Sequence, residues 1–109
     1  MMFKDLGAEP QSKPLSENQI TPLMSEIPRW QYHPERTLIS REYVFSNYAD
    51  ALTFTLKTGQ MAQAQNHHPN IHLFYNKCLV EYTTHRPAGI TMNDFICAEK
   101  VDQIYALID

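Results

Sequence analysis

Histidine is concentrated in one stretch of this chain, and the chemistry that histidine does best is proton transfer. Residues 66–94 contain four of the five histidines. The unperturbed pKa of a histidine lies near neutrality, so a group of histidines can donate and accept protons at working pH. We therefore predict an acid–base site built from this stretch, which contains His67, His68, His72 and His85.

The residues alone leave three interpretations of these histidines open. A single histidine on a strand or at a helix end is usually structural, although the adjacent pair before Pro69 weakens that interpretation. A metal site would take three nitrogens from the four side chains, but adjacent histidines tend to point apart and the spacing matches no common metal motif. Metal-free acid–base catalysis suits two or three imidazoles around a small-molecule pocket. A nucleophilic Cys78 is less favoured, because the sequence offers no cue for a lowered thiol pKa.

Composition indicates a folded domain and excludes several partners. The hydrophobic fraction is 43%, and one Trp, six Tyr and five Phe are enough for a packed core. The formal net charge of −3 and the scattered Lys and Arg argue against binding to nucleic acid or to anionic lipid. Two cysteines form no disulfide framework, and no run of residues approaches the length of a membrane span. We expect a cytoplasmic protein.

The order of predicted elements gives the fold class. Residues 1–14 show no periodicity and are expected to form a flexible arm, and residues 15–109 to form one domain. Capping signals and apolar periodicity predict the order α-β-β-α-β-β-α, an α+β fold with a four-stranded antiparallel sheet and three helices packed on one face. The predicted helices cover about 17–27, 47–66 and 92–108, and the strands cover about 30–32, 37–45, 73–75 and 78–84. Pro22 is expected either to kink the first helix or to restart it.

The second helix carries two apolar stripes. Placed at 100° per residue, six residues form the face that we expect to cover the sheet: Tyr48, Ala51, Leu52, Leu56, Gly59 and Ala62. Phe54 and Met61 lie seven residues apart on a second stripe, which is the spacing of a helix–helix seam. We therefore predict that the chain self-associates through Phe54 and Met61.

The histidine stretch resembles the pterin-4a-carbinolamine dehydratases. That family is marked by an Asn/Asp-His-His-Pro run, a Tyr-Asn-Lys turn, a Thr-His pair 18 residues after the first His and an Asp nine residues later. The same spacings occur here in Asn66-His67-His68-Pro69, Tyr75-Asn76-Lys77, Thr84-His85 and Asp94. The likeness extends through Ile27-Pro28-Arg29-Trp30, Arg41 and Phe45, so it covers about residues 15–108.

The resemblance implies an activity and a set of site residues. It implies a metal-free lyase without a cofactor that dehydrates 4a-hydroxytetrahydropterin to quinonoid dihydropterin. This reaction regenerates tetrahydrobiopterin for the aromatic amino-acid hydroxylases. The family assembles as dimers and tetramers. By position, the catalytic imidazoles would be His67, His68 and His85, and the pterin would be lined by Asn66, Thr83, Thr84, Arg86, Asp94 and Gln63. Asp94 is expected to orient His85 or to cap the last helix.

Two positions depart from the family pattern. Gln63 stands where the family usually has Glu, and an amide does not favour imidazolium as a carboxylate would. Ile71 stands where the family often has Trp, which removes an aromatic wall from the mouth of the pocket. Some members of the family also bind a transcription factor as coactivators, so the alternative function is a protein-binding module with little or no dehydratase activity.

Overall fold

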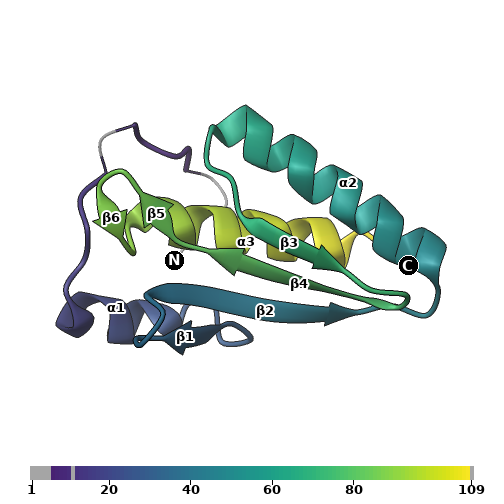
Figure 1. The fold of residues 1–109 in the computed structure, drawn as a ribbon, viewed down its shortest axis with the longest axis horizontal. Coiled ribbons are helices and arrows are strands. Elements are labelled where there is room, and N and C mark those ends of the chain that lie inside the picture. The colour runs from purple at the N-terminus through teal and green to yellow at the C-terminus, as the bar shows by residue number, and fades with distance from the viewer. Residues whose placement is uncertain (1–5, 11, 109) are drawn as a thin grey trace.

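The computed structural model describes residues 6–10 and 12–108, and its main elements follow the predicted order (Figure 1). A short two-stranded hairpin, β5–β6, is added where a loop was expected after the fourth strand. The helices are α1 (Glu17–Met24), α2 (Tyr48–Gln65) and α3 (Met92–Ala106). The strands are β1 (Gln31–His33), β2 (Leu38–Val44), β3 (Asn70–Leu73), β4 (Lys77–Tyr82), β5 (Thr84–His85) and β6 (Ala88–Gly89).

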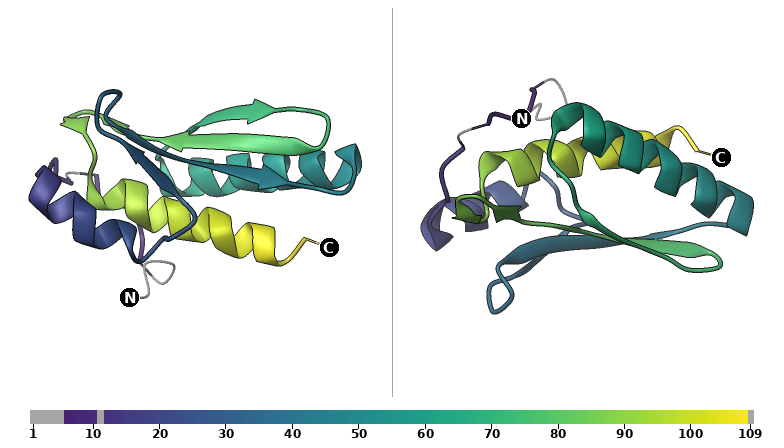
Figure 2. Two further views of the ribbon diagram at one scale, coloured as in Figure 1. Left: turned by 90° about the horizontal axis from the view of Figure 1, so that it is seen from below. Right: turned by 45° about the horizontal axis from the view of Figure 1, so that its top comes forward.

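The four long strands form one antiparallel sheet in the order β1-β2-β4-β3. Helices α2 and α3 lie side by side over one face of this sheet, and α1 lies near the start of α3 (Figure 2). The predicted α+β architecture is therefore confirmed. In the described part of the chain, no helix combines the length and the apolar character needed to cross a membrane.

The helix starts follow from local hydrogen bonding. The backbone N–H of Ser16 donates to the Gln19 side chain at 2.8 Å, as a capping box requires. Helix α1 then continues through Pro22, so the helix does not restart at that residue. Helix α2 starts after Asn47, whose side-chain oxygen accepts a hydrogen bond from the Asp50 N–H at 2.8 Å.

The predicted seam of Phe54 and Met61 is wrong, because both side chains face the core. Phe54 is fully buried, and Met61 is partly buried against the core cluster. The Phe54 ring packs among three aromatic rings from β2, the segment after it and α3, at centroid distances of 4.6, 5.2 and 6.0 Å from Tyr43, Phe45 and Tyr105. Such ring packing is worth about 0.5–1.5 kcal/mol per pair beyond the area it buries.

The opposite stripe of α2 is exposed instead. Tyr48, Leu52 and Leu56, which we expected in the core, are 43%, 47% and 61% exposed. Tyr48 stacks on the ring of Tyr75 from the β3–β4 turn, at 6.2 Å between centroids. The face of α2 assigned from periodicity was therefore rotated relative to the face that the sheet covers.

The predicted arm follows the outside of the domain before α1. Residues 1–5 and 11 of the arm lie outside the described residues. The N–H of Leu15 donates to the Ile90 carbonyl at 2.7 Å, and Pro14 lies against Gly89. Gly89 has a φ of 140°, and a Cβ at this position would stand 2.9 Å from Pro14 Cβ, so only glycine fits.

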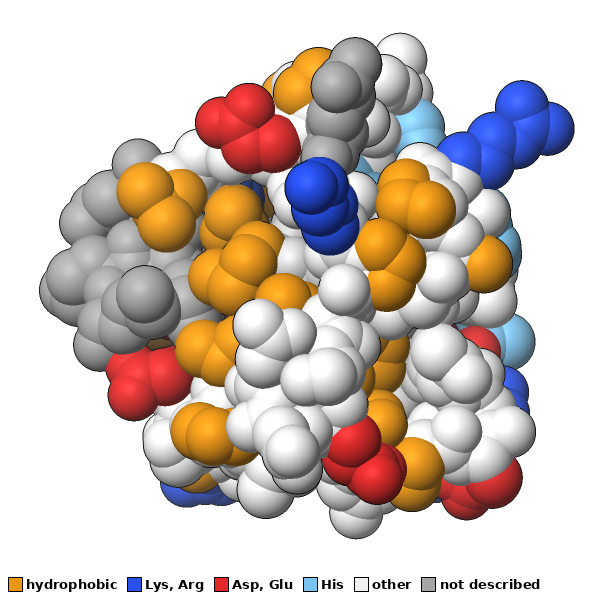
Figure 3. Space-filling model, turned by 90° about the vertical axis from the view of Figure 1, so that its left-hand side faces the viewer, with side chains coloured by type: hydrophobic (Ala, Val, Ile, Leu, Met, Phe, Trp, Pro, Cys, Tyr) orange, Lys and Arg blue, Asp and Glu red, His pale blue; other side chains and the backbone are white. Residues whose placement is uncertain are grey.

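On the end of the molecule drawn in Figure 3, the described basic side chains stand apart from one another.

Candidate active site

The end of α2 separates the two adjacent histidines. Asn66 adopts the left-handed conformation, with φ 52° and ψ 42°, and closes the helix in the way that asparagine permits at this position. The N–H of His67 donates back to the Ala62 carbonyl at 3.1 Å. The chain therefore turns sharply, and the two imidazoles point to different partners, as expected for neighbours in sequence.

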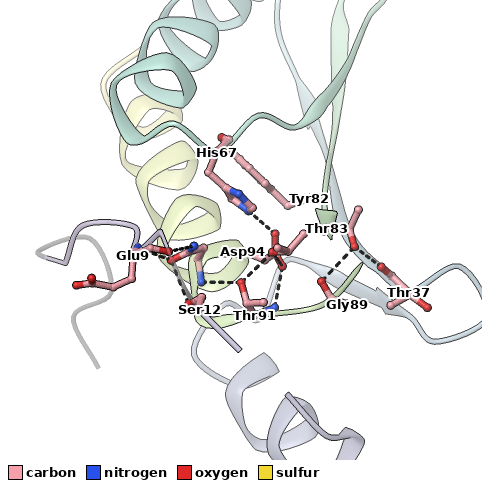
Figure 4. A network of polar contacts seen from close by, with 11 residues as sticks. Glu9, Ser12, Thr37, His67, Tyr82, Thr83, Gly89, Thr91 and Asp94 are labelled. Atoms are coloured by element: carbon pink, nitrogen blue, oxygen red, sulfur yellow. Dashed lines mark hydrogen bonds and ion pairs between the residues drawn. The ribbon is translucent and has the colours of Figure 1, made fainter. Parts of the chain in front are cut away.

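His67 turns inward and meets a buried carboxylate (Figure 4). Its Nε2 lies 2.6 Å from Asp94 Oδ1. Asp94 has no solvent exposure, and its second oxygen, Oδ2, accepts hydrogen bonds from Thr84 Oγ1 and from the Thr91 N–H, each at 2.9 Å. Asp94 therefore caps α3 and orients a histidine at the same time. The prediction that it would orient His85 is wrong, because the imidazole at Asp94 belongs to His67.

Tyr82 fixes the plane of the His67 ring. The two rings stack with centroids 5.2 Å apart and planes 13° apart, and the Tyr82 hydroxyl donates to the His67 carbonyl at 3.0 Å. Burial raises the pKa of Tyr82 far above its usual value, so this hydroxyl remains a donor. With Asp94 on one ring nitrogen and Tyr82 on the ring face, little freedom of orientation is left to His67.

The Asp94 contact determines which nitrogen of His67 is available. A carboxylate accepts hydrogen bonds and cannot donate them, so the proton between Asp94 and His67 belongs to Nε2. The neutral imidazole then carries its lone pair on Nδ1. His67 is thus arranged as a histidine that can take up and return one proton at a defined atom.

The other histidines lie in different surroundings. His68 is exposed, and its Nε2 lies 2.8 Å from the side-chain oxygen of Gln63, which is also exposed. His85 is exposed on β5. His72 pairs with Glu81 on the sheet, at 3.2 Å. None of these three histidines lines the cavity described next.

A small polar cavity of about 220 Å³ opens beside His67. Of the predicted site residues, four line it: Asn66, His67, Thr84 and Arg86. The other five predicted residues do not line it, and these are Gln63, His68, Thr83, His85 and Asp94. The Thr83 hydroxyl donates to the Thr37 carbonyl at 2.7 Å. The sequence analysis missed the remaining lining residues, which are Ala8, Glu9, Pro10, Gln65 and Asn93. Gln65 and Asn93 are next in sequence to the motif residues Asn66 and Asp94, so they could have been predicted as site residues from that position. Nothing in the sequence predicts that the arm lies at the cavity.

The described residues contain no group of three or more His, Cys, Asp or Glu side chains placed to hold a metal ion. The two thiols lie in the core, where burial raises the pKa of Cys78 and raises that of Cys97 to about 11. Neither thiol lines the cavity. The residues that line the cavity carry an oriented imidazole, the Thr84 hydroxyl, three side-chain amides, a guanidinium and the Glu9 carboxylate.

An oriented histidine–carboxylate pair beside a small polar cavity, on an α+β scaffold, is a site suited to proton transfer on a small molecule. The profile of the family described as pterin 4 alpha carbinolamine dehydratase matches residues 13–104. The chain belongs to this family, as the resemblance in the sequence predicted.

Individual relatives agree with the family assignment. A protein of Nitrosospira multiformis, provisionally named pterin-4-alpha-carbinolamine dehydratase, is 41% identical over 101 residues, which cover 93% of this chain and 85% of the relative. A protein of Chromobacterium violaceum with the same provisional name is 32% identical over 107 residues, covering 96% and 97%. The crystal structure of a transcriptional coactivator/pterin dehydratase from Brucella melitensis superposes with a TM-score of 0.81 at 27% identity, covering 85% of this chain and 99% of that one.

Proposed function

We propose that this protein dehydrates 4a-hydroxytetrahydropterin to quinonoid dihydropterin by histidine acid–base catalysis without a metal. The family assignment supports the substrate class. The observation that carries the reaction type is the 2.6 Å contact between His67 and the buried Asp94 at the edge of the cavity. Physiologically, the reaction would regenerate tetrahydrobiopterin for aromatic amino-acid hydroxylases in the cytoplasm, and the two buried free cysteines fit that reducing compartment.

The reaction needs two proton transfers. The bond between C4a and its hydroxyl oxygen breaks, and the oxygen leaves as water after it accepts a proton from a general acid. A general base removes the N5 proton, and the electron pair of that N–H bond becomes the second bond between N5 and C4a. Positioned acids and bases each contribute roughly 10²–10⁴-fold to such a rate.

We assign these transfers to His67, His68 and His85. His67 is held by Asp94 through Nε2, and among the described residues nothing is hydrogen-bonded to its Nδ1, which suits a group that must exchange a proton at a fixed place. His68 and His85 are exposed, so their imidazoles are accessible to a ligand from solvent. Asn66, Thr84 and Arg86 line the cavity and would hold the polar pterin ring, with Thr83, Asp94 and Gln63 around them.

A direct assay decides the proposal. The substrate is generated in situ by a tetrahydropterin-dependent hydroxylase, and formation of quinonoid dihydropterin is followed with the chain freed of metal by a chelator. We expect dehydration above the spontaneous rate, unchanged by the chelator. A rate lost to chelation and restored by zinc would contradict the metal-free mechanism. Binding of a reduced pterin without turnover would favour the alternative of a binding module.

The outer face of α2 supports assembly into homo-dimers or homo-tetramers. Tyr48, Leu52 and Leu56 recur every four residues, so their exposed side chains line one side of the helix. The double change Leu52→Glu, Leu56→Glu should reduce the mass measured by size-exclusion chromatography with light scattering. A control with Thr53→Glu and Ala64→Glu, both exposed and about 100° or more round the helix from Leu52, should keep the parent mass. A monomeric parent protein, or a double variant of unchanged mass, would exclude this face.

A further inference from the structure

The described part of the N-terminal arm forms one wall of the cavity beside His67. Ala8, Glu9 and Pro10 line this cavity together with the residues at the end of α2 and the start of α3. The arm reaches this place from the far end of the sequence, with 84 positions between Glu9 and its main partner, Asn93. The wall therefore exists only in the folded chain.

Two side-chain amides hold the arm by its backbone. The Glu9 N–H donates to Asn93 Oδ1 at 2.7 Å, and Asn93 Nδ2 donates to the Glu9 carbonyl at 2.7 Å (Figure 4). The Ala8 N–H donates to Gln65 Oε1 at 2.9 Å. Asn93 Oδ1 also accepts a longer hydrogen bond from Ser12 Oγ, at 3.4 Å. Because Asn93 is only 7% exposed, its amide would lose both bonds to Glu9 if residues 8–10 moved away, unless water replaced them. The Asn93 side chain thus bonds both the N–H and the carbonyl of Glu9, as a residue on a neighbouring antiparallel β-strand would.

The backbone of Asn93 also belongs to the hydrogen-bond network that orients His67. The backbone N–H of Asn93 donates to Thr91 Oγ1 at 3.2 Å, and the Thr91 and Thr84 hydroxyls are hydrogen-bonded at 2.8 Å. Thr84 in turn donates to Asp94, the partner of His67. The arm is therefore connected to the proton-transfer site through Asn93, whose side chain bonds Glu9 and whose backbone N–H bonds Thr91.

We propose that residues 8–10 are a strap that encloses the substrate, with Asn93 and Gln65 as positioning residues that hold it closed. The inference rests on the proposed function for the identity of the ligand, a reduced pterin. With the strap in place a cavity of about 220 Å³ remains, so the strap is a wall and does not fill the site. This volume lies below the roughly 300–1,000 Å³ of pockets for drug-sized ligands, which suits a small bicyclic ring.

The strap has a physical task in the proposed reaction. A wall of backbone and Pro10 keeps bulk water away from one side of His67 and from the bound ring. Hydrogen bonds and charges act more strongly where water is excluded, so ligand binding should depend on the closed strap. The strap carries none of the three histidines, so the proton transfers themselves should depend on it much less.

A matched pair of proline substitutions tests the strap in the full chain. Glu9→Pro removes the N–H that donates to Asn93. The control is Lys13→Pro, at an exposed residue of the arm that also precedes a proline and does not line the cavity. The Kd of 7,8-dihydrobiopterin, measured by fluorescence titration, should rise by roughly threefold to tenfold in Glu9→Pro, the range for one lost hydrogen bond. Lys13→Pro should stay within about twofold of the parent protein, on the same scale.

Steady-state kinetics and hydrogen exchange complete the test. Glu9→Pro should raise KM in parallel with Kd and leave kcat within about twofold, because the hydrogen bond that it removes is not part of the chemistry. In the parent protein the amides of Ala8 and Glu9 should exchange slowly, and Glu9→Pro should speed exchange at Ala8.

Each result bears on one of the two proposals. Fast exchange at Ala8 and Glu9 in the parent protein would overturn the strap whatever the ligand. Equal Kd values in the parent protein and both variants would overturn its role in binding, while the dehydratase activity stood. A parent protein that neither binds 7,8-dihydrobiopterin nor dehydrates the carbinolamine would overturn the proposed function, and with it the ligand assigned to the strap.

Discussion

Replacing Asp94 by Asn tests whether the orientation of His67 matters for catalysis. Three donors converge on this buried carboxylate: Nε2 of His67, Oγ1 of Thr84 and the N–H of Thr91. Asparagine offers one oxygen and one NH2 group in nearly the same volume. If its oxygen stays with Thr84 and Thr91, its NH2 group faces His67 and forces the lone pair onto Nε2. The free nitrogen, Nδ1, would then carry the proton.

The expected loss of rate follows from this reversed tautomer. A positioned acid or base contributes roughly 10²–10⁴-fold, so kcat for dehydration should fall by about that factor, or about 3–5 kcal/mol of barrier. Folding stability should also fall by about 1–3 kcal/mol, because a charge-assisted bond is lost inside the protein. The first quantity is measured with the dehydration assay, and the second by urea denaturation.

Asp102→Asn is the matched control. The Asp102 carboxylate also accepts three hydrogen bonds, at 3.0, 2.7 and 2.6 Å, from Trp30, Arg41 and Tyr43. It does not line the cavity. This variant should lose comparable stability and keep kcat within about twofold, since its network does not touch His67. An Asp94→Asn variant with kcat within about threefold of the parent protein, or an equal loss of kcat in Asp102→Asn, would refute the reasoning.

Three further predictions concern the remaining polar groups. His85→Ala should lower kcat by roughly 10²–10⁴-fold, whereas His72→Ala should have little effect; equal losses in the dehydration assay would show that the site was assigned wrongly. Gln63→Glu places a carboxylate where an amide oxygen now lies 2.8 Å from Nε2 of His68. The carboxylate favours imidazolium, so the acidic limb of the pH–rate profile should move to higher pH, and an unmoved limb would mean that the two positions are not coupled. Burial alone would raise the pKa of Glu81, but the hydrogen bond from His72 and the charge and hydrogen bond of Arg36 outweigh burial and hold the pKa below its usual 4.5. A lowered pKa in the folded state stabilises the protein above about pH 4.5, and this stability is lost as the pH falls through the lowered value. Urea denaturation between pH 6 and pH 3 should therefore show a steeper loss for the parent protein than for Glu81→Gln, and parallel curves would contradict it.

The sequence alone predicted where the helices begin, because a helix start depends on residues that are close together in the chain. Ser16, Asn47 and Thr91 begin helices where capping residues should, and each has a partner two or three positions away. Alternation located β2 and β4, whereas the predicted strand 73–75 shares only Leu73 with β3, which covers Asn70–Leu73. The hairpin β5–β6 was missed, since two-residue strands carry no periodic signal.

The face of α2 could not be decided from periodicity alone. This helix has apolar residues on two sides, and both stripes satisfy the helical period. Phe54 is buried because the aromatic rings of Tyr43, Phe45 and Tyr105 meet it, and those rings come from β2, the segment after it and α3. A helix buries the stripe that has partners, and those partners are known only from the tertiary structure.

The candidate site divides in the same way. The sequence alone showed the histidine motif, its spacing and the family. These depend only on the order of residues along the chain, which also places motif residues at the end of α2 and the start of α3. Only the folded chain decided that Asp94 meets His67 and not His85, because that choice depends on the left-handed turn at Asn66 and on the stacking of Tyr82. The docking of residues 8–10 on Asn93 depends on contacts across 84 positions, and no local preference encodes a contact of that range.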